Sequence, residues 1–162
     1  IWSKYSRGGV NMDAKEIQAP FQLVGTRIIK FNMTNDFVTL NNSNSVKCNA
    51  NYSIESFEED DDKYVGIIRL YVKAVIKGED KAKIKCDIIF EGCFISPIAI
   101  EKEKFLSMLG VNGCASLFSL SRAFICSATS LATSGGQMIL PMINTFKLAK
   151  DGQIEKQAGS TQ

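Results

Sequence analysis

The alternation of apolar and polar residues predicts four β-strands between residues 21 and 94. Residues 46–55 alternate strictly, with apolar side chains at the even positions and Lys, Asn, Ser or Glu between them. The runs 63–78 and 80–94 have the same period, and 21–36 has it less regularly because Arg27 falls at an apolar position. This period is typical of strands with one buried and one solvated face. The short connections between successive runs predict an antiparallel meander.

Two helices are predicted after the strands. Residues 101–109 form a short amphipathic pattern that Gly110 would close. Residues 113–136 carry one charged residue, Arg122, and Gly135-Gly136 would end the helix. The pattern therefore predicts an α+β fold, in which a four-stranded antiparallel sheet carries a long helix and short helices on one face.

The long helix is apolar on more than one side. Leu117, Leu120, Phe124, Ala128 and Leu131 follow at three- and four-residue steps, and Cys114, Phe118 and Ile125 lie on a neighbouring face. A helix that is apolar around most of its girth has to be covered from two directions. The sheet would be one cover and a second copy of the chain the other, so we expect an oligomer with an interface that includes Leu117, Phe118, Leu120, Phe124, Ile125 and Leu131.

Apolar residues are also frequent in the connections, where polar residues are the norm. They occur in 94–108 and again in QMILPMIN (137–144). One interpretation is that these loops fold down as a lid on the core, which would account for more than half of them. The functional interpretation is a groove lined by aliphatic, aromatic and methionine side chains, which re-pack around varied shapes and suit binding without sequence specificity.

Composition narrows the function classes. The net charge of +2 favours neither nucleic acid nor an anionic membrane, and the chain contains no histidine. The absence of histidine removes Ser-His and Cys-His nucleophile systems and makes most enzyme classes unlikely candidates. The five cysteines include no CxxC pair, so we expect reduced thiols, no metal site and no cofactor.

We expect three segments: a flexible leader over 1–20, one domain over 21–150 and a polar tail over 151–162. Residues 113–136 are diluted by Gly, Ser and Thr, which disfavours membrane insertion. Lys4 and Arg7 are not followed by an apolar stretch, so no signal peptide is expected and a cytoplasmic location is favoured. Five acidic residues at 58–62 would form a solvated hairpin tip or, alternatively, a handle for a basic partner.

Several short motifs occur in a fixed order around these elements. They are Phe21-Gln22 at the first strand, YVGIIRLYVKAVIKGEDKAKIKCDIIFEG (64–92), Gly92-Cys93-Phe94-Ile95-Ser96, Leu109-Gly110, Leu117-Phe118-Ser119-Leu120-Ser121-Arg122 and Leu140-Pro141-Met142-Ile143-Asn144. In their order and spacing they resemble the SecB family of bacterial export chaperones, over roughly Phe21 to Phe146. Three departures are Ile95, which stands one place early in 92–96, the missing proline in 117–122 and the shifted proline in 140–144.

The resemblance implies a homotetramer built as a dimer of dimers, with long helices sandwiched between sheets. It also implies an ATP-independent holdase that binds unfolded or precursor polypeptides in hydrophobic grooves. Carried over to this sequence, the groove would be lined by Phe94, Ile98, Ile100, Phe105, Leu109, Met138, Leu140 and Met142.

The residues that dock the SecA motor in the family are acidic, and this chain departs from them. Lys30 and Thr34 stand where the family has carboxylates, Lys77 stands at a neighbouring apolar contact, and only Glu79 keeps its acid. A lysine that faces a basic partner repels it, so SecA delivery is doubtful. The family also includes members that guard an antitoxin, and the loss of docking acids fits that role.

Three functions are therefore weighed. The first is a SecB-like holdase, and the second is a dedicated binding module that masks one partner, such as an antitoxin. The third is a small-molecule carrier or enzyme in which Glu101 or Glu103 is the working carboxylate. No convergent polar group accompanies the apolar residues, and the dipole of the short helix already explains these glutamates, so the non-enzymatic functions are preferred.

Overall fold

In a computed structural model, the protein is described over residues 13, 18–36, 38–40, 44–78 and 82–151. Most of the expected leader (1–20) and nearly all of the expected tail (151–162) lie outside the described residues. So does Glu79, the acid that the sequence offered for motor docking.

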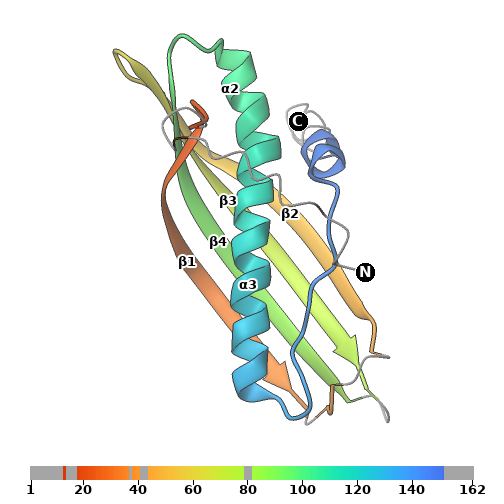
Figure 1. The fold of residues 1–162 in the computed structure, drawn as a ribbon. Helices are drawn as coiled ribbons and strands as arrows, with labels where there is room; N and C mark the ends of the chain where they lie inside the picture. Colours follow the sequence, from red (N-terminus) through yellow and green to blue (C-terminus); the bar gives the residue numbers. More distant parts are fainter. Residues whose placement is uncertain (1–12, 14–17, 37, 41–43, 79–81, 152–162) are drawn as a thin grey trace, which may run out of the picture.

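Four long antiparallel strands form a single sheet (Figure 1). The strands are β1 (Gln22–Asn35), β2 (Val46–Glu59), β3 (Lys63–Lys77) and β4 (Lys83–Pro97), and their order in the sheet is β1-β4-β3-β2. The meander expected from the sequence holds for β2, β3 and β4. It is wrong for β1, which joins the far side of β4 with Gln22 opposite Ile95.

The helical part of the chain lies across one face of the sheet (Figure 1). It comprises α2 (Lys102–Met108), a π-helical turn η2 (Leu109–Gly113) and α3 (Cys114–Ala132). Gly110 does not close the short helix, because the π turn carries the chain directly into α3. A Cβ atom at Gly110 would lie 3.3 Å from the Tyr52 hydroxyl, so the glycine here permits close packing of the helix on β2.

The inner face of the sheet forms the core. The residues predicted for the buried faces of β3 and β4 are nearly inaccessible, with Ile68, Leu70, Ala74 and Ile84 at 0% exposure. Two β1 bulges, between Leu23 and Gly25 and between Ile28 and Lys30, shift the side-chain alternation. They place Arg27 on the outer face opposite Glu91, which explains its irregular position in the sequence.

The buried stripe of α3 is polar at two positions. It consists of Cys114, Leu117, Phe118, Ser121, Ile125 and Thr129. The hydroxyls of Ser121 and Thr129 donate to the carbonyl oxygens of Leu117 and Ile125 at 2.8 and 2.7 Å, so both can be buried without an unsatisfied donor. This stripe differs from the predicted one. Leu120 and Leu131 belonged to the predicted stripe, but in the structure both are exposed to solvent.

By length and composition alone, the helical stretch Lys102–Ala132 would suffice to cross a membrane. In the fold, 44% of its most apolar window is buried in the subunit, where the helix covers the inner face of the sheet. The core helix of a soluble protein passes the same test, so length and composition alone do not identify the stretch as a membrane span.

Candidate functional site

After α3 the chain returns along the helix as an extended stretch, here called the return segment (residues 137–144), and ends in a helix over 145–151. In Figure 1 the return segment runs beside α3, between the helix and β2. Its side chains alternate. Met138 and Leu140 are buried at 0% and 1% exposure, whereas Ile139 between them is 56% exposed.

Three side-chain contacts hold the return segment to α3. The Met138 amide donates to the Thr129 hydroxyl at 2.8 Å. Arg122 donates from Nε to the Leu140 carbonyl oxygen at 2.8 Å and from Nη1 to the Met142 sulfur at 3.1 Å. These contacts use main-chain atoms of Met138 and Leu140 and only the sulfur of Met142, so the Ile139 side chain and most of the Met142 side chain are left for other contacts.

The residues expected to line a groove divide into two groups. Phe94, Phe105, Leu109, Met138 and Leu140 are core residues of the subunit, with exposures of 0–1%. Ile98 is 39% exposed, Ile100 is half-buried and Met142 is 80% exposed. The structure therefore buries the first group in the core of the subunit and leaves Ile98 and Met142 on the surface.

Two of the buried residues, Phe94 and Phe105, belong to an aromatic cluster that holds α2 on the sheet. The Phe21 and Phe94 rings stack with centroids 5.1 Å apart, and the Phe105 ring lies 5.5–5.9 Å from those of Phe21, Phe57 and Tyr64. Gly66 leaves the space for this contact, since a Cβ atom there would lie 2.7 Å from the Leu109 side chain. Displacing α2 would uncover these rings.

Sequence reasoning missed two exposed apolar residues near the return segment. Ile139 was not assigned to the groove, although it stands between two residues that were. Phe146, in the final helix, is 74% exposed. The period of two through 138–140 would have identified Ile139 as the outward residue of an extended segment.

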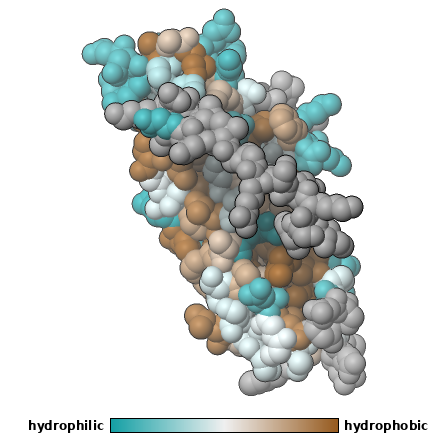
Figure 2. Space-filling model, viewed as in Figure 1, coloured by the Kyte–Doolittle hydropathy of each residue, from teal (hydrophilic) through white to brown (hydrophobic). Residues whose placement is uncertain are grey.

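A hollow lies on each side of the return segment. On the α3 side, an open hollow of about 260 Å³ is lined by Ser119, Arg122, Ala123, Cys126, Ile139 and Leu140. On the β2 side, a hollow of about 480 Å³ is lined by Cys48, Asn49, Ala50, Ile143, Asn144, Lys147, Leu148 and Asp151. Figure 2 shows brown, hydrophobic surface on this helix-bearing face. The hollows are large enough for single side chains of a bound polypeptide.

The residues expected at the oligomer interface also divide. Leu117, Phe118 and Ile125 are buried against the sheet within one subunit, and Phe124 packs edge-on against Phe31 of β1 at a centroid distance of 4.9 Å. Leu120 and Leu131 are 37% and 91% exposed. Only these two present large apolar side chains that a second copy would cover.

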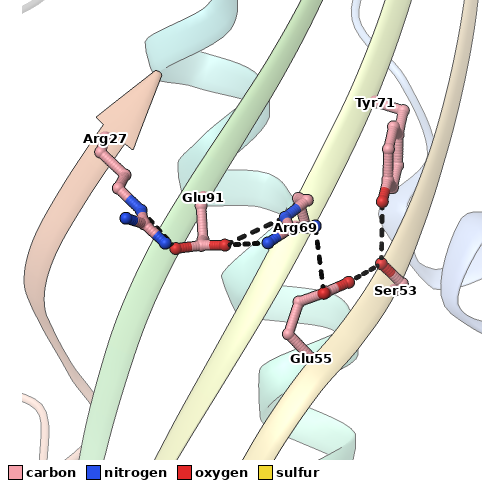
Figure 3. Close-up of polar contacts among 6 residues, drawn as sticks. All are labelled: Arg27, Ser53, Glu55, Arg69, Tyr71 and Glu91. Atoms are coloured by element: carbon pink, nitrogen blue, oxygen red, sulfur yellow. Dashed lines mark hydrogen bonds and ion pairs between the residues drawn. The ribbon is translucent and has the colours of Figure 1, made fainter. Parts of the chain in front are cut away.

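A row of charged side chains crosses the outer face of the sheet (Figure 3). Glu91 of β4 accepts hydrogen bonds from Arg27 Nε at 2.6 Å and from Arg69 Nη2 at 2.7 Å, and Arg69 Nη1 reaches Glu55 at 3.1 Å. The hydrogen bond from Arg27, followed by that from Arg69, holds the pKa of Glu91 below its usual value despite burial. The row ties all four strands together.

The acidic run forms a hairpin turn, as one of its two interpretations expected. β2 ends at Glu59 and β3 begins at Lys63, with the Asp60 amide bonded to the Lys63 carbonyl oxygen at 2.9 Å. The glutamates considered for catalysis, Glu101 and Glu103, are exposed where α2 begins. They line none of the hollows described above.

The cysteines are free thiols. Burial raises the pKa of Cys86 to about 11 and that of Cys114 to about 12, so both are protonated near neutral pH and pack as small apolar groups. Among the described residues, no three His, Cys, Asp or Glu side chains come close enough together to hold a metal ion.

No protein-family model matches the sequence, and the search of curated proteins returns no match. Among solved structures, the chain is similar to the Mycobacterium tuberculosis SecB-like chaperone Rv1957 in complex with a ChAD peptide from the HigA1 antitoxin, with 13% identity and a TM-score of 0.54. That match covers 77% of this chain and 91% of the chaperone. A Streptococcus agalactiae protein of unknown function matches at 10% identity and a TM-score of 0.41, over 75% and 97% of the two chains.

The similarity to the SecB-like chaperone confirms the α+β architecture that the sequence resemblance implied. The chain has a SecB-like fold: a four-stranded antiparallel sheet with a long helix and a short helix on one face.

Proposed function

We propose that this protein is a SecB-like chaperone that binds extended polypeptide segments without using ATP. The observation that carries the proposal is the exposed apolar surface beside the return segment. Ile139 is 56% exposed, Met142 80% and Phe146 74%, and hollows for further side chains lie on both sides of the segment. Large apolar side chains exposed on one part of the surface are typical of a protein-binding site.

The binding energy would come from several modest contacts. Each apolar side chain of a client buried against Ile98, Ile139 or Met142 would contribute up to about 2 kcal/mol. Several such contacts are needed to offset the entropy lost when a flexible chain is ordered. Methionine suits this role because its unbranched side chain adapts to different partners.

We further propose that subunits assemble through the outward side of α3 into the homotetramer expected from the sequence. Leu120 and Leu131 are the large apolar residues that this assembly would cover. Phe94, Phe105 and Leu109 remain candidate groove residues, because movement of α2 on assembly or client binding would uncover them.

A second candidate function is a dedicated chaperone that masks one partner, such as an antitoxin. The SecB-like chaperone Rv1957 is bound to an antitoxin peptide, which favours this alternative. Lysines on the outer sheet face, such as Lys30, argue against a role that depends on docking the basic SecA motor.

The test is suppression of aggregation by the purified chain. Unfolded, reduced α-lactalbumin is diluted with and without the protein, and light scattering is followed in the absence of nucleotide. The holdase proposal expects suppression, together with a defined complex in size exclusion with light scattering. Met142→Glu combined with Phe146→Glu should abolish it, because carboxylates at these positions oppose burial of client side chains.

Thr34→Glu is the control, since it adds a negative charge at an exposed position on the opposite face of the sheet. No suppression by excess wild-type protein would exclude a general holdase. Tight binding of one antitoxin peptide without general suppression would support the dedicated chaperone instead.

A further inference from the structure

The outer face of the sheet separates its charges along the strands. Its middle row is neutral, because Arg27 and Arg69 are paired with Glu91 and Glu55 (Figure 3). Near the C-terminal end of β3, the outward-facing positions of the four strands include Lys30, Lys47, Lys73 and Lys85. We call these four residues the lysine end of the sheet.

The lysine end is not neutralised within the described part of the chain. The acidic side chain next to these lysines on the outer face is Asp87, which lies opposite Lys73. Among the described residues, none of the four lysines forms an ion pair within 4.0 Å. All four are exposed. Unpaired like charges on one face of a sheet attract an oppositely charged partner and favour rapid association.

A hollow of about 380 Å³ lies beside these lysines. It is lined by Asn49, Ala50, Asn51, Tyr71 and Lys73. The amides, the phenol and the ammonium group supply hydrogen-bond donors that fit a carboxylate, and the Tyr71 ring supplies an apolar wall. The hollow gives one anchored position within a broader basic surface.

We propose that the lysine end docks an acidic, Glu- or Asp-rich segment of a partner protein. The segment lies along β2 and β3, with one carboxylate in the hollow beside Lys73 and others near Lys47 and Lys85. This surface is on the opposite face of the sheet from the helices and the return segment, so the proposal does not depend on chaperone activity.

The acidic turn at 58–62 of a second copy is the competing occupant. That turn is closed by the hydrogen bond from the Asp60 amide to the Lys63 carbonyl oxygen, and Lys63 lies 3.5 Å from Asp60. It therefore offers a compact, partly neutralised loop and not an extended strip. An extended acidic segment of a different protein fits the row of lysines better.

The test measures fluorescence anisotropy of a fluorescein-labelled oligoglutamate peptide. Binding to the wild-type chain is expected at low salt and should weaken as salt rises. The charge reversal Lys47→Glu/Lys73→Glu/Lys85→Glu should weaken it at least about tenfold. Lys102→Glu/Lys104→Glu/Lys150→Glu makes the same change in net charge at exposed positions of the helical elements and should leave binding near the wild-type level.

Circular dichroism establishes that both variants are folded. Absence of oligoglutamate binding at low salt, or equal losses in the two variants, would overturn the proposal. Salt-sensitive self-association that disappears in Asp60→Lys/Asp61→Lys/Asp62→Lys would also overturn it, because the occupant would then be a second copy.

Discussion

The Nε atom of Arg122 donates a hydrogen bond to the main-chain oxygen of Leu140 at 2.8 Å, which joins the middle of α3 to the return segment. Arg122 is the one charged residue between 113 and 136, and it also contacts the Met142 sulfur. The one charged side chain of α3 thus holds the return segment, on which Ile139 and Met142 are exposed to solvent.

Arg122→Met is expected to loosen the return segment while keeping the length of the side chain. Loss of a charged hydrogen bond to a carbonyl oxygen should lower the free energy of unfolding by about 1–3 kcal/mol. Hydrogen exchange of the amides in 138–143 should accelerate more than exchange in β3. Lys104→Met is the control at an exposed helix position, and unchanged exchange in Arg122→Met would show that Thr129 alone holds the segment.

Gly66→Ala should displace α2 from the sheet. The added methyl group would lie 2.7 Å from Leu109 Cδ2 and 3.1 Å from the Phe105 ring, and overpacking of this kind costs about 1–3 kcal/mol. The variant should have a lower urea midpoint and bind more of the dye ANS, because the aromatic cluster is uncovered. Gly25→Ala has no neighbour within 4 Å and should be as stable as the wild type.

The row through Glu91 predicts a specific dependence of stability on pH. Because Arg27 and Arg69 lower the pKa of Glu91 in the folded chain, the pairs stabilise it fully above the unfolded pKa of about 4.3. That stability is lost as pH falls through the lower folded value. Glu91→Gln should therefore reduce the free energy of unfolding by about 1–3 kcal/mol near neutral pH.

The difference between Glu91→Gln and the wild type should shrink in strong acid, where the wild-type carboxyl is protonated. Urea titrations near neutral pH and below about pH 3 measure it. A difference that stays constant with pH would mean that packing, and not charge, holds Glu91 in place.

Leu120→Glu/Leu131→Glu should dissociate the proposed assembly and leave the subunit folded. Both side chains are exposed in the single chain, so the substitution buries no charge within it. Light scattering should show a smaller particle with unchanged circular dichroism. Leu117→Ala is the contrast: it removes a fully buried side chain and should cost about 2–5 kcal/mol of stability. An unchanged mass in the double variant would place the interface elsewhere.

The strands could be predicted from the sequence because their alternation records one buried and one solvated face. Ile68 to Ile76 and Ile84 to Phe90 lie on the buried side as expected. The place of β1 could not be predicted, since the short connections suggested pairing in chain order. In the sequence, the only sign of its bulges was that Arg27 interrupts the alternation. The structure explains this position, because the bulges place Arg27 opposite Glu91 on the outer face.

The helix and the site were predicted less completely for a physical reason. An apolar stripe shows that a helix face is buried, but not against what, so Leu117 and Leu131 looked alike although one is in the core and the other is 91% exposed. The apolar pattern did not assign Ser121 and Thr129 to the buried stripe because both are polar. They can be buried because their hydroxyls donate to carbonyl oxygens of the same helix. Likewise, Phe105 and Met142 are both apolar residues outside the strands and the long helix, but one is in the core and the other is 80% exposed.

The strand order β1-β4-β3-β2 has a consequence for how the subunit folds. β2, β3 and β4 are joined by short turns and pair with their neighbours in the sequence. β1 instead pairs with β4, and both β2 and β3 lie between these two strands in the sequence. Strands that are distant in the sequence pair slowly, because the entropy of closing a long loop is lost before stabilising contacts form. We expect β1 to be the last strand to join, so a chain still emerging from the ribosome exposes the unpaired edge of β4. A protein proposed to protect unfinished chains would itself pass through an aggregation-prone, unfinished state.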